Sequence, residues 1–556
     1  MRKYLLTFLL LTVVISFASA RPRSLKEKLQ VAQQQLNKNS SLCAKAAGGG
    51  KQSAELLCEY SDLSIVGYTD GGFVVVTNDD MFTPIVGYSD ASFSRTDNPN
   101  FQWWLENMNQ TLAQLAASGE ELVTITPSPL YSQKVDALVK TSWGQDSPYN
   151  AQCPMYTDET TGQKVSFVTG CIATAMAQIM NYHQYPTKGK GSKSYFFSYG
   201  TDSRIRASAN FGNTTYEWDK MIDAYTTTAM GKANYTEEQA QAVSTIMYHA
   251  GVSVQMGYTP SGSGAYSSDA CLALRQYFCY DPNIKMYSRY VYPVDEWMNI
   301  IFKELNDNCP VLYTGVSSSQ GGHAFVVDGY DENGLVHVNW GWNGSQDGNY
   351  NVSSMKGFSQ QQDIVIMRKP DDTRFDSKYF SIWGMLSNLS ITQYGYNLNV
   401  SSDGIYNFDV ENFTGAYGVL AMNLSTGEIT PLYQSQVSDI EYGYGSRFSV
   451  NSLDASALSE GEYRIYLGTK SENEPSWQPV RCSENYNNSY ILTRTATSMS
   501  ISAENNPNWT TTAIKSIAVD MNEKPSHTWY SINGQRLNAE PTQRGIYIHN
   551  GKKVVK

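Results

Sequence analysis

One cysteine stands at the start of a stretch that predicts a buried helix. In SFVTGCIATAMAQIMNYHQYP, residues 166–186, no Gly or Pro interrupts residues 172–185, and apolar side chains leave almost no polar stripe. Gly170 precedes the predicted helix and Pro186 ends it. Cys171 therefore lies in the first turn, where unpaired N–H groups and the helix dipole favour an anion. We expect a lowered thiol pKa and a candidate nucleophile, although a lone cysteine is more often a small buried apolar residue.

A thiol nucleophile needs a base within reach, and the chain contains six histidines. His183 lies too far along the same helix as Cys171. Two others, His249 and His337, lie in apolar runs typical of core histidines. His527 and His549 belong to the far C-terminal part. His323 differs, because it follows two glycines and begins the predicted strand HAFVVDGY, where a side chain can face a cleft. It lies 152 residues after Cys171 (323 − 171), an order and spacing typical of papain-like proteases.

The third catalytic group is predicted from strand pairing. DENG, residues 331–334, indicates a turn between strands 323–330 and 335–342, and a loop of even length places odd residues of one strand opposite even residues of the other. His323 then shares a face with Trp340 and Trp342, while Asn339 lies on the opposite face. A one-residue bulge would invert this assignment. We expect a Cys–His dyad with Trp340 and Trp342 around the imidazole, keep Asn339 as a lesser candidate, and note that both tryptophans also suit plain core packing.

Four segments resemble signature blocks of the streptopain family of bacterial cysteine peptidases: WGQDSPYNAQCP, TGCIATAMAQIMNYHQYP, GGHAFVVDGY and HVNWGWNGSQDGNY. The resemblance covers roughly residues 130–370. It implies a papain-like fold and a cysteine endopeptidase that hydrolyses peptide bonds through an acyl-enzyme. Cys171 would be the nucleophile, and His323 would pair with the thiolate and later protonate the leaving amine. Gln145 matches the family's glutamine and would bind the oxyanion together with the N–H of Cys171.

Substrate contacts follow partly from the residues and partly from the resemblance. Gly322 has no side chain to keep a substrate backbone away from the dyad. The Gly/Ser-rich loop 258–268, with Ser263 and Gly264, lies beside the cleft in the family. The resemblance also implies a preference for a bulky apolar residue at P2, one position before the P1 residue. The expected partners are protein or peptide substrates and the chain's own propeptide.

The N-terminal sequence and the composition predict where the protein is located and which partners are disfavoured. The chain opens with a basic start, an apolar run over residues 4–17 and Ala18-Ser19-Ala20, which predicts a secretory signal peptide and a secreted or cell-surface protein. The net charge of −11, without a cluster of Lys and Arg, disfavours a nucleic-acid partner. No later segment is long and apolar enough to predict a transmembrane segment. Eight scattered cysteines without CxxC or HExxH motifs favour neither a disulfide scaffold nor a metal site, and we expect no cofactor.

The expected fold class is α+β, in five parts. We expect a signal peptide over residues 1–20, an inhibitory propeptide over 21–130, and a papain-like peptidase domain over 131–370. Short alternating runs separated by Gly, Asn and Ser predict an immunoglobulin-like β-sandwich over residues 371–505. Residues 506–556 contain two hairpin signals, Asn533-Gly534 and Asn550-Gly551, and resemble a C-terminal sorting tail.

Two other functions remain open from the sequence. A papain-fold amidase or transglutaminase could use the same dyad on other substrates, and a catalytically silent surface adhesin could keep the fold without the chemistry. The presence of Cys171, His323 and Gln145 favours the peptidase. Because the expected propeptide precedes the catalytic segments, we expect a zymogen that is cut between about residues 120 and 142, where two prolines indicate a linker.

Overall fold

The computed structural model of the chain describes residues 21–38, 53–317, 321–354 and 361–504, together with four short strands within 529–555. Residues 1–508 form one compact unit and residues 509–556 a second. The predicted signal peptide lies outside the described residues. The described helices are α1 (Leu25–Lys38), α3 (Pro99–Ser118), α4 (Cys171–His183), α5 (Glu237–Ser253), α6 (Ser267–Gln276), α7 (Val294–Asn306) and the short 3₁₀ helices η1 (Phe211–Asn213), η2 (Trp218–Lys220) and η3 (Arg289–Val291).

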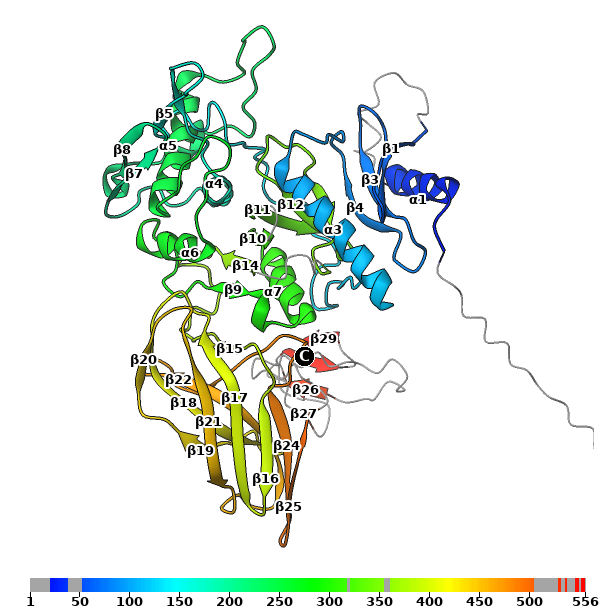
Figure 1. Cartoon of the computed structure of the whole chain (residues 1–556), viewed down its shortest axis with the longest axis vertical. Helices are drawn as coiled ribbons and strands as arrows, with labels where there is room; N and C mark the ends of the chain where they lie inside the picture. The colour runs from blue at the N-terminus through cyan, green and yellow to red at the C-terminus, as the bar shows by residue number, and fades with distance from the viewer. Residues whose placement is uncertain are drawn as a thin grey trace, which may run out of the picture. The chain divides into compact units, whose positions relative to one another are not determined.

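A sheet of ten described strands runs through the first unit (Figure 1). Its spatial order is β1 (Glu55–Glu59), β2 (Leu63–Gly67), β3 (Phe73–Thr77), β4 (Ile85–Ser89), β13 (Gly348–Tyr350), β12 (Val336–Asn339), β11 (Gly321–Tyr330), β10 (Val311–Ser317), β14 (Gln361–Ile366) and β9 (Met286–Ser288). Strands β4 and β13 pair antiparallel, with Ser89 opposite Gly348. The N-terminal region is therefore joined edge to edge to the sheet that carries His323.

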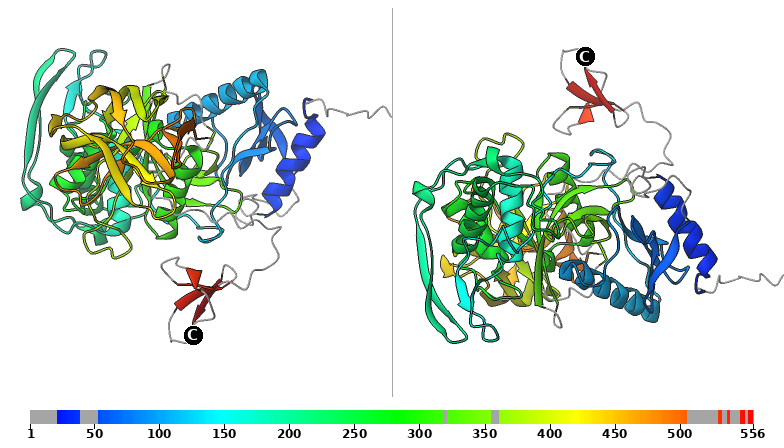
Figure 2. Two further views of the ribbon diagram at one scale, coloured as in Figure 1. Left: turned by 90° about the horizontal axis from the view of Figure 1, so that it is seen from below. Right: turned by 90° about the horizontal axis from the view of Figure 1, so that it is seen from above.

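Alternation along the strands separates two cores. Ala324 and Val326 of β11 face a core that contains α4, α5 and α6, whereas Phe325 and Val327 face a second core that contains α3 and α7. The hairpins β5 (Met155–Thr157) with β6 (Lys164–Ser166) and β7 (Lys193–Tyr199) with β8 (Asp202–Ala209) lie on the α5 side of the unit (Figure 1). Within the N-terminal strands, α1 packs on the face of Val74, and α3 packs on the face of Phe73 (Figure 2).

Helix α3 is defined by local chemistry at both ends. Asn98 caps its start, because the side-chain oxygen of Asn98 accepts a hydrogen bond from the N–H of Phe101 at 2.9 Å. Pro99 follows at the first helical position, and Gly119 ends the helix with a left-handed φ of 69°. The buried face of α3 includes Trp103 and Trp104. Both tryptophans thus reach the second core.

The predicted pairing of β11 with β12 is confirmed, although the connection differs from the expectation. Val326 pairs with Asn339, as an even loop over 331–334 requires, but Tyr330 pairs with Val336 rather than with Leu335. The register shifts by one residue between Val327 and Gly329. The extra loop residue shifts the pairing by one position, and the bulge shifts it back. The residues of β11 and β12 therefore lie on the faces that were predicted.

Residues that follow the central sheet form two further sheets around a shared core. One contains β15 (Trp383–Met385), β16 (Ser390–Tyr394), β17 (Asn397–Asn407) and β21 (Gly445–Asp454). The other contains β18 (Phe413–Asn423), β19 (Ile429–Gln434), β20 (Ser438–Ile440), β22 (Gly461–Ser471), β23 (Gln478–Pro479), β24 (Ser489–Arg494) and β25 (Met499–Ala503). Trp383 of the first sheet and Phe413 of the second belong to the same core, with ring centroids 4.9 Å apart. We call residues 381–504 the two-sheet domain.

Charged pairs attach the two-sheet domain to the central sheet. Lys285, directly before β9, donates to Asp409 at 2.5 Å, and both side chains are almost fully buried. Arg289 of η3 pairs with Glu484 at 2.5 Å, and Arg481 pairs with Glu296 of α7. A buried pair is sensitive to loss of one partner, since the other charge is then left uncompensated away from water. These contacts define one relative position of the two-sheet domain and the central sheet.

The second unit contains β26 (Trp529–Ser531), β27 (Arg536–Leu537), β28 (Ile546–His549) and β29 (Lys552–Val555). Trp529 pairs with Leu537, and His549 pairs with Lys552, so the strands that flank both predicted hairpin turns are confirmed as partners. In the part of the chain that the structure describes, no helix combines the length and the hydropathy needed to cross a bilayer.

The buried Lys285–Asp409 pair yields a stability prediction. Asp409→Asn keeps the shape of the side chain but leaves the Lys285 ammonium without its anion, so it should lower the free energy of unfolding by about 3–5 kcal/mol. The matched control is Asp136→Asn, which breaks the exposed Lys134–Asp136 pair and should cost less than about 1 kcal/mol. Denaturant unfolding of the three proteins measures both values. Equal midpoints for the two variants would contradict the structural role of the buried pair.

Candidate functional site

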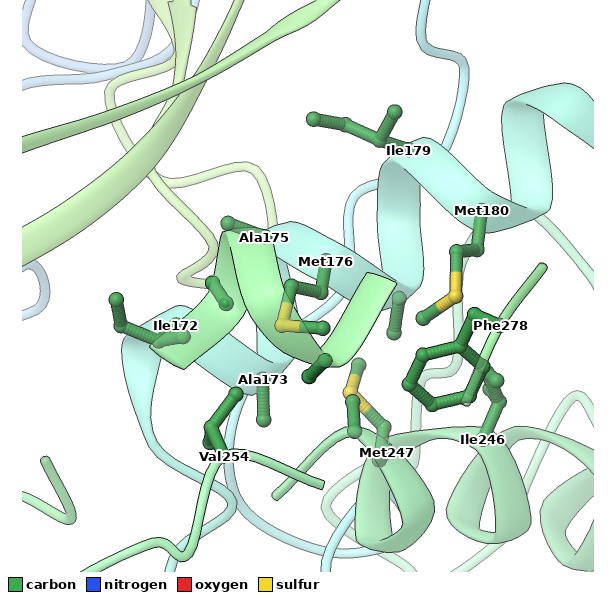
Figure 3. Packing of buried hydrophobic residues seen from close by; sticks show 14 of the residues in the cluster. Ile172, Ala173, Ala175, Met176, Ile179, Met180, Ile246, Met247, Val254 and Phe278 are labelled. Atoms are coloured by element: carbon green, nitrogen blue, oxygen red, sulfur yellow. The ribbon is translucent and has the colours of Figure 1, made fainter. Parts of the chain in front are cut away.

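Cys171 is the first residue of α4, as predicted, and the helix is held in place from all sides. Residues 172–180 are all buried. Figure 3 shows Met176 and Met180 of α4 packing with Met247 of α5 and with Phe278. The predicted buried helix is confirmed, and its first residue, Cys171, lies at the edge of the core and is half-buried as a whole residue.

The backbone turns sharply at Gly170, directly before Cys171. Gly170 has a φ of 91°, and a Cβ at this position would lie 2.7 Å from the carbonyl oxygen of Ser263. The Ser263 hydroxyl in turn donates to the carbonyl oxygen of Val168 at 2.8 Å. The loop around Ser263 therefore presses against the residues that set the position of Cys171. Only glycine fits at position 170.

The thiol pKa of Cys171 differs from the expectation. Burial among protein atoms raises it above its ordinary value, and the main-chain N–H groups of Ala324, Ile172 and Cys171 itself only partly oppose the rise. The expected lowering by the helix start is outweighed because desolvation penalises the thiolate more than these groups stabilise it. In this form of the chain the thiol is protonated at neutral pH.

His323 lies on β11 beside Ala324, and its ring packs against Trp103 of α3, which was not among the expected neighbours. The centroids of the His323 and Trp103 rings are 5.1 Å apart, with an angle of 56° between their planes. Burial lowers the pKa of His323 to about 4. No hydrogen bond joins His323 to Cys171 among the described residues. The imidazole is therefore neutral and unpaired with the thiol.

Two side chains of α3 reach into this region, and the sequence interpretation identified neither. Trp103 covers His323, and Asn100 donates from its amide to the carbonyl oxygens of Ala324 at 3.0 Å and Trp340 at 3.1 Å. The Asn98-Pro99 start and the Gly119 end could have revealed the helix. Its target could not have been found in this way, because nothing local specifies which surface α3 covers.

Gln145 is 3% exposed and lies beside the start of α4. Its carbonyl oxygen accepts a hydrogen bond from the N–H of Thr169 at 3.1 Å, which links it to the turn before Cys171. Among the described residues, no protein group is hydrogen-bonded to the side-chain amide of Gln145. A buried amide that keeps its donors available suits a developing negative charge.

Asn339 lies in a buried hydrogen-bond network rather than beside His323. Its amide donates to the carbonyl oxygen of Thr141 at 2.6 Å, and its side-chain oxygen accepts from Gln178 of α4 at 3.0 Å and from the N–H of Gly341 at 3.1 Å. This network ties α4 to the segment before Gln145. The face predicted for Asn339 is confirmed by its pairing with Val326.

The two tryptophans differ in their surroundings. Trp340 is fully buried, and its ring packs with Phe325 at 4.9 Å and with Phe101 of α3 at 6.2 Å, while its indole N–H donates to Gln346. Trp342 is partly buried against the same core. Among the described residues, the ring contact of His323 is with Trp103, because α3 occupies the face of β11 that His323 shares, and the expected packing of Trp340 around the imidazole stays a prediction.

Of the three expected substrate-contact residues, two are exposed at the surface and one is buried. Gly322 and Gly264 are exposed, and a Cβ at Gly264 would meet no atom within 4 Å. Ser263 is buried, and its hydroxyl is engaged with Val168, so it shapes the loop. In the described parts of the chain, no group of three or more His, Cys, Asp or Glu side chains is placed to hold a metal ion.

Two protein families match the chain. Residues 143–350 match the Peptidase C10 family, and residues 20–112 match the Spi protease inhibitor family. The first range contains Gln145, Cys171 and His323, and the second contains Trp103. The tilted ring contact between Trp103 and His323 therefore joins an inhibitor-like region to a peptidase-like region.

Relatives and a solved structure extend the match. The chain is 31% identical over 359 residues to the thiol protease/hemagglutinin PrtT of Porphyromonas gingivalis, which covers 60% of this chain but only 39% of PrtT. It is 31% identical over 337 residues to streptopain of Streptococcus pyogenes, covering 56% of this chain and 81% of streptopain. The structure of a Prevotella intermedia prointerpain A fragment matches with a TM-score of 0.51 and 40% identity, over 56% of this chain and 97% of the fragment.

The contact between Trp103 and His323 yields a titration prediction. In the full-length chain carrying Cys171→Ala, His323 should titrate near pH 4, because protonation of a buried imidazole is penalised. Adding Trp103→Ala should raise its pKa toward about 6.5 by letting water reach the ring. Histidine side-chain NMR measures both values, with assignment by His323→Gln. His249, whose pKa burial lowers to about 4 in the other core, is the internal control and should not move. A pKa of His323 near 6.5 in both proteins would contradict the contact.

Proposed function

The chain belongs to the streptopain family of cysteine peptidases, the Peptidase C10 family, and is a thiol protease made as a zymogen, and from this premise we propose that Cys171 and His323 hydrolyse peptide bonds once the N-terminal region has left. One observation carries the assignment. Ala324, the residue next to His323, belongs to the core against which Cys171 packs, and its N–H acts to lower the pKa of the Cys171 thiol. The base therefore lies one residue from a group that acts on the nucleophile.

The proposed reaction begins when Trp103 no longer covers His323. The exposed imidazole takes the thiol proton, and the thiolate attacks the substrate carbonyl carbon to form a tetrahedral intermediate. The N–H of Cys171 and the side-chain amide of Gln145 donate to the oxyanion. His323 then gives its proton to the leaving amine, and water hydrolyses the acyl-enzyme with His323 as the base. Asn339, Trp340 and Trp342 act as positioning residues that hold β12 and α4.

The division of the chain is part of the proposal. Residues 21–130 form the inhibitory propeptide, residues 131–370 the papain-like domain, residues 371–505 an immunoglobulin-like β-sandwich and residues 506–556 a sorting-like tail. A signal peptide at residues 1–20 would direct the protein to the cell surface or the medium. In the zymogen, the propeptide acts by burying His323 under Trp103 and by occupying the adjacent carbonyl groups through Asn100.

The proposed substrates are protein chains with a bulky apolar residue at P2. The exposed Gly322 and Gly264 leave room for a substrate backbone on either side of the dyad, and Ser263 keeps the loop against Gly170. The segment between α3 and the peptidase domain contains Leu130, which is 76% exposed. Leu130 is thus the best-placed P2 residue in the proposed maturation region, residues 120–142.

The catalytic assignment is tested by three variants. Cys171→Ala should abolish casein cleavage without changing the unfolding transition, and His323→Ala should lower activity to the same background. Gln145→Ala should lower kcat by about 10²–10³-fold with little effect on KM, because its donors act on the oxyanion. Cleavage assays and circular dichroism provide the readouts. Casein cleavage by the Cys171→Ala protein would contradict the mechanism, and thiol labelling without cleavage of any protein would favour an amidase or transglutaminase.

Maturation provides a second test. On storage, the purified wild-type chain should be converted to a smaller form, whereas Cys171→Ala should stay full length. Added active enzyme should cut the Cys171→Ala chain between residues 120 and 142, which separates loss of catalysis from misfolding. Gel electrophoresis and N-terminal sequencing identify the product. If the purified uncut chain hydrolyses substrate as fast as the cut form, residues 21–130 do not inhibit.

A further inference from the structure

A cavity of about 810 Å³ lies where three regions of the chain meet. The end of α3 and the residues after it form one wall, the central sheet with η3 and α7 forms another, and the two-sheet domain forms the third. Its lining includes Leu115 and Val123 of the first wall, Tyr290 and Gln362 of the second, and Leu386 and Tyr486 of the third. No part of the proposed catalytic mechanism uses it.

Strand register places this cavity close to His323. Gly315 of β10 pairs with His323 on one side and with Gln362 on the other. Paired residues share a face of the sheet, and neighbouring strands lie about 4.8 Å apart, so Gln362 lies roughly 10 Å from His323 on the same face. Tyr313 and Phe325, two residues further along their strands, stack at 5.0 Å on this face. Gly315 has no side chain to interrupt the path.

Helix α3 contacts His323 and also lines the cavity. Trp103 packs on His323, and Leu115 lines the cavity. Twelve residues separate them (115 − 103), which corresponds to about 18 Å along a helix. When the propeptide leaves, its wall of the cavity leaves with it. The cavity then becomes a groove that is open toward His323.

The same surface already binds an extended polypeptide segment. The carbonyl oxygen of Val123 accepts a hydrogen bond from the Ser354 hydroxyl, and Asn351 donates to the Thr124 hydroxyl at 2.8 Å. The N–H of Ile125 reaches the hydroxyl of Ser353 at 3.5 Å. Two of these contacts involve the main chain of the propeptide, so they do not depend on its side chains. A second extended chain could take the same place.

The wall formed by the two-sheet domain stays in place after the propeptide has gone. Arg289 and Glu484 join the loop 483–486 to η3, and the buried Lys285–Asp409 pair attaches the domain as a whole. Leu386 on this wall is 42% exposed, which leaves an apolar side chain available to a ligand. None of these anchoring contacts involves the propeptide.

We propose that the two-sheet domain supplies the distal part of the substrate groove, and that an extended segment of a protein substrate lies there after maturation, against Leu386 and the loop 483–486. This inference rests on the proposed function. A substrate residue spans about 3.3 Å, so the groove begins about three residues from the scissile bond. Short peptides end before it, and protein chains reach it.

The experiment compares two substrates on the mature enzyme. A casein-derived peptide with arms of about six residues on both sides of the cut spans the groove, and the same peptide trimmed to about two residues on each side does not. Leu386→Ser removes the apolar contact, and Asn485→Trp fills the groove from the exposed loop. Tyr394→Ser is the matched control, since Tyr394 is 86% exposed on β16 of the same domain and does not line the cavity.

Both groove variants should raise KM for the long peptide by about fivefold to tenfold, the usual effect of losing one apolar anchor. Their kcat and their turnover of the trimmed peptide should match those of Tyr394→Ser. Equal KM values for the long peptide in all three variants would overturn the distal groove while leaving the dyad intact. Failure of the wild-type enzyme to cleave either peptide, or to be labelled at Cys171, would overturn the proposed function itself.

Discussion

In the proposed mechanism, the inactive state depends on the burial of the His323 imidazole against Trp103. A neutral, desolvated ring cannot form an ion pair with a thiolate, and the thiol of Cys171 is itself held protonated by burial. The rest of the site is already assembled, because Gln145 and the start of α4 are held by hydrogen bonds that do not involve α3. Trp103 and Asn100 are the side chains of α3 that contact His323 and the carbonyl groups beside it.

The two faces of the sheet at β11 pack against different helices, so α3 can leave without disturbing α4. The face of Ala324 and Val326 packs on α4, and the described core on this side contains no residue before Val139. The face of Phe325 and Val327 is completed by Phe101 and Trp104 of α3. Removing α3 therefore opens one face of β11 and leaves the helix that carries Cys171 supported. The edge pairing of β4 with β13 adds backbone hydrogen bonds, which hold the propeptide without requiring particular side chains.

The structure differs from the sequence interpretation at three points. The helix start at Cys171 was expected to lower the thiol pKa, but desolvation outweighed the N–H groups. The turn at 331–334 was one residue too short, and the bulge between Val327 and Gly329 restored the expected register. The sequence does not predict that Trp103 of α3 contacts the imidazole. The turn and the bulge belong to one hairpin, whereas the surroundings of Cys171 and His323 come from segments that lie far apart in the chain.

Local chemistry in the sequence was sufficient for much of the protein. Glycine and proline boundaries with a continuous apolar pattern identified α4 and placed Cys171 in its first turn, and alternation along β11 and β12 placed Asn339 and Trp340 on opposite faces. Both rest on periodicities of the backbone, which neighbouring residues carry. Only the tertiary structure decided that α3 covers His323, that the propeptide strands extend the central sheet, and that the two-sheet domain forms a wall of the cavity near Gln362. These arrangements depend on which apolar faces meet across the molecule, and the pattern of a single segment does not specify its partner.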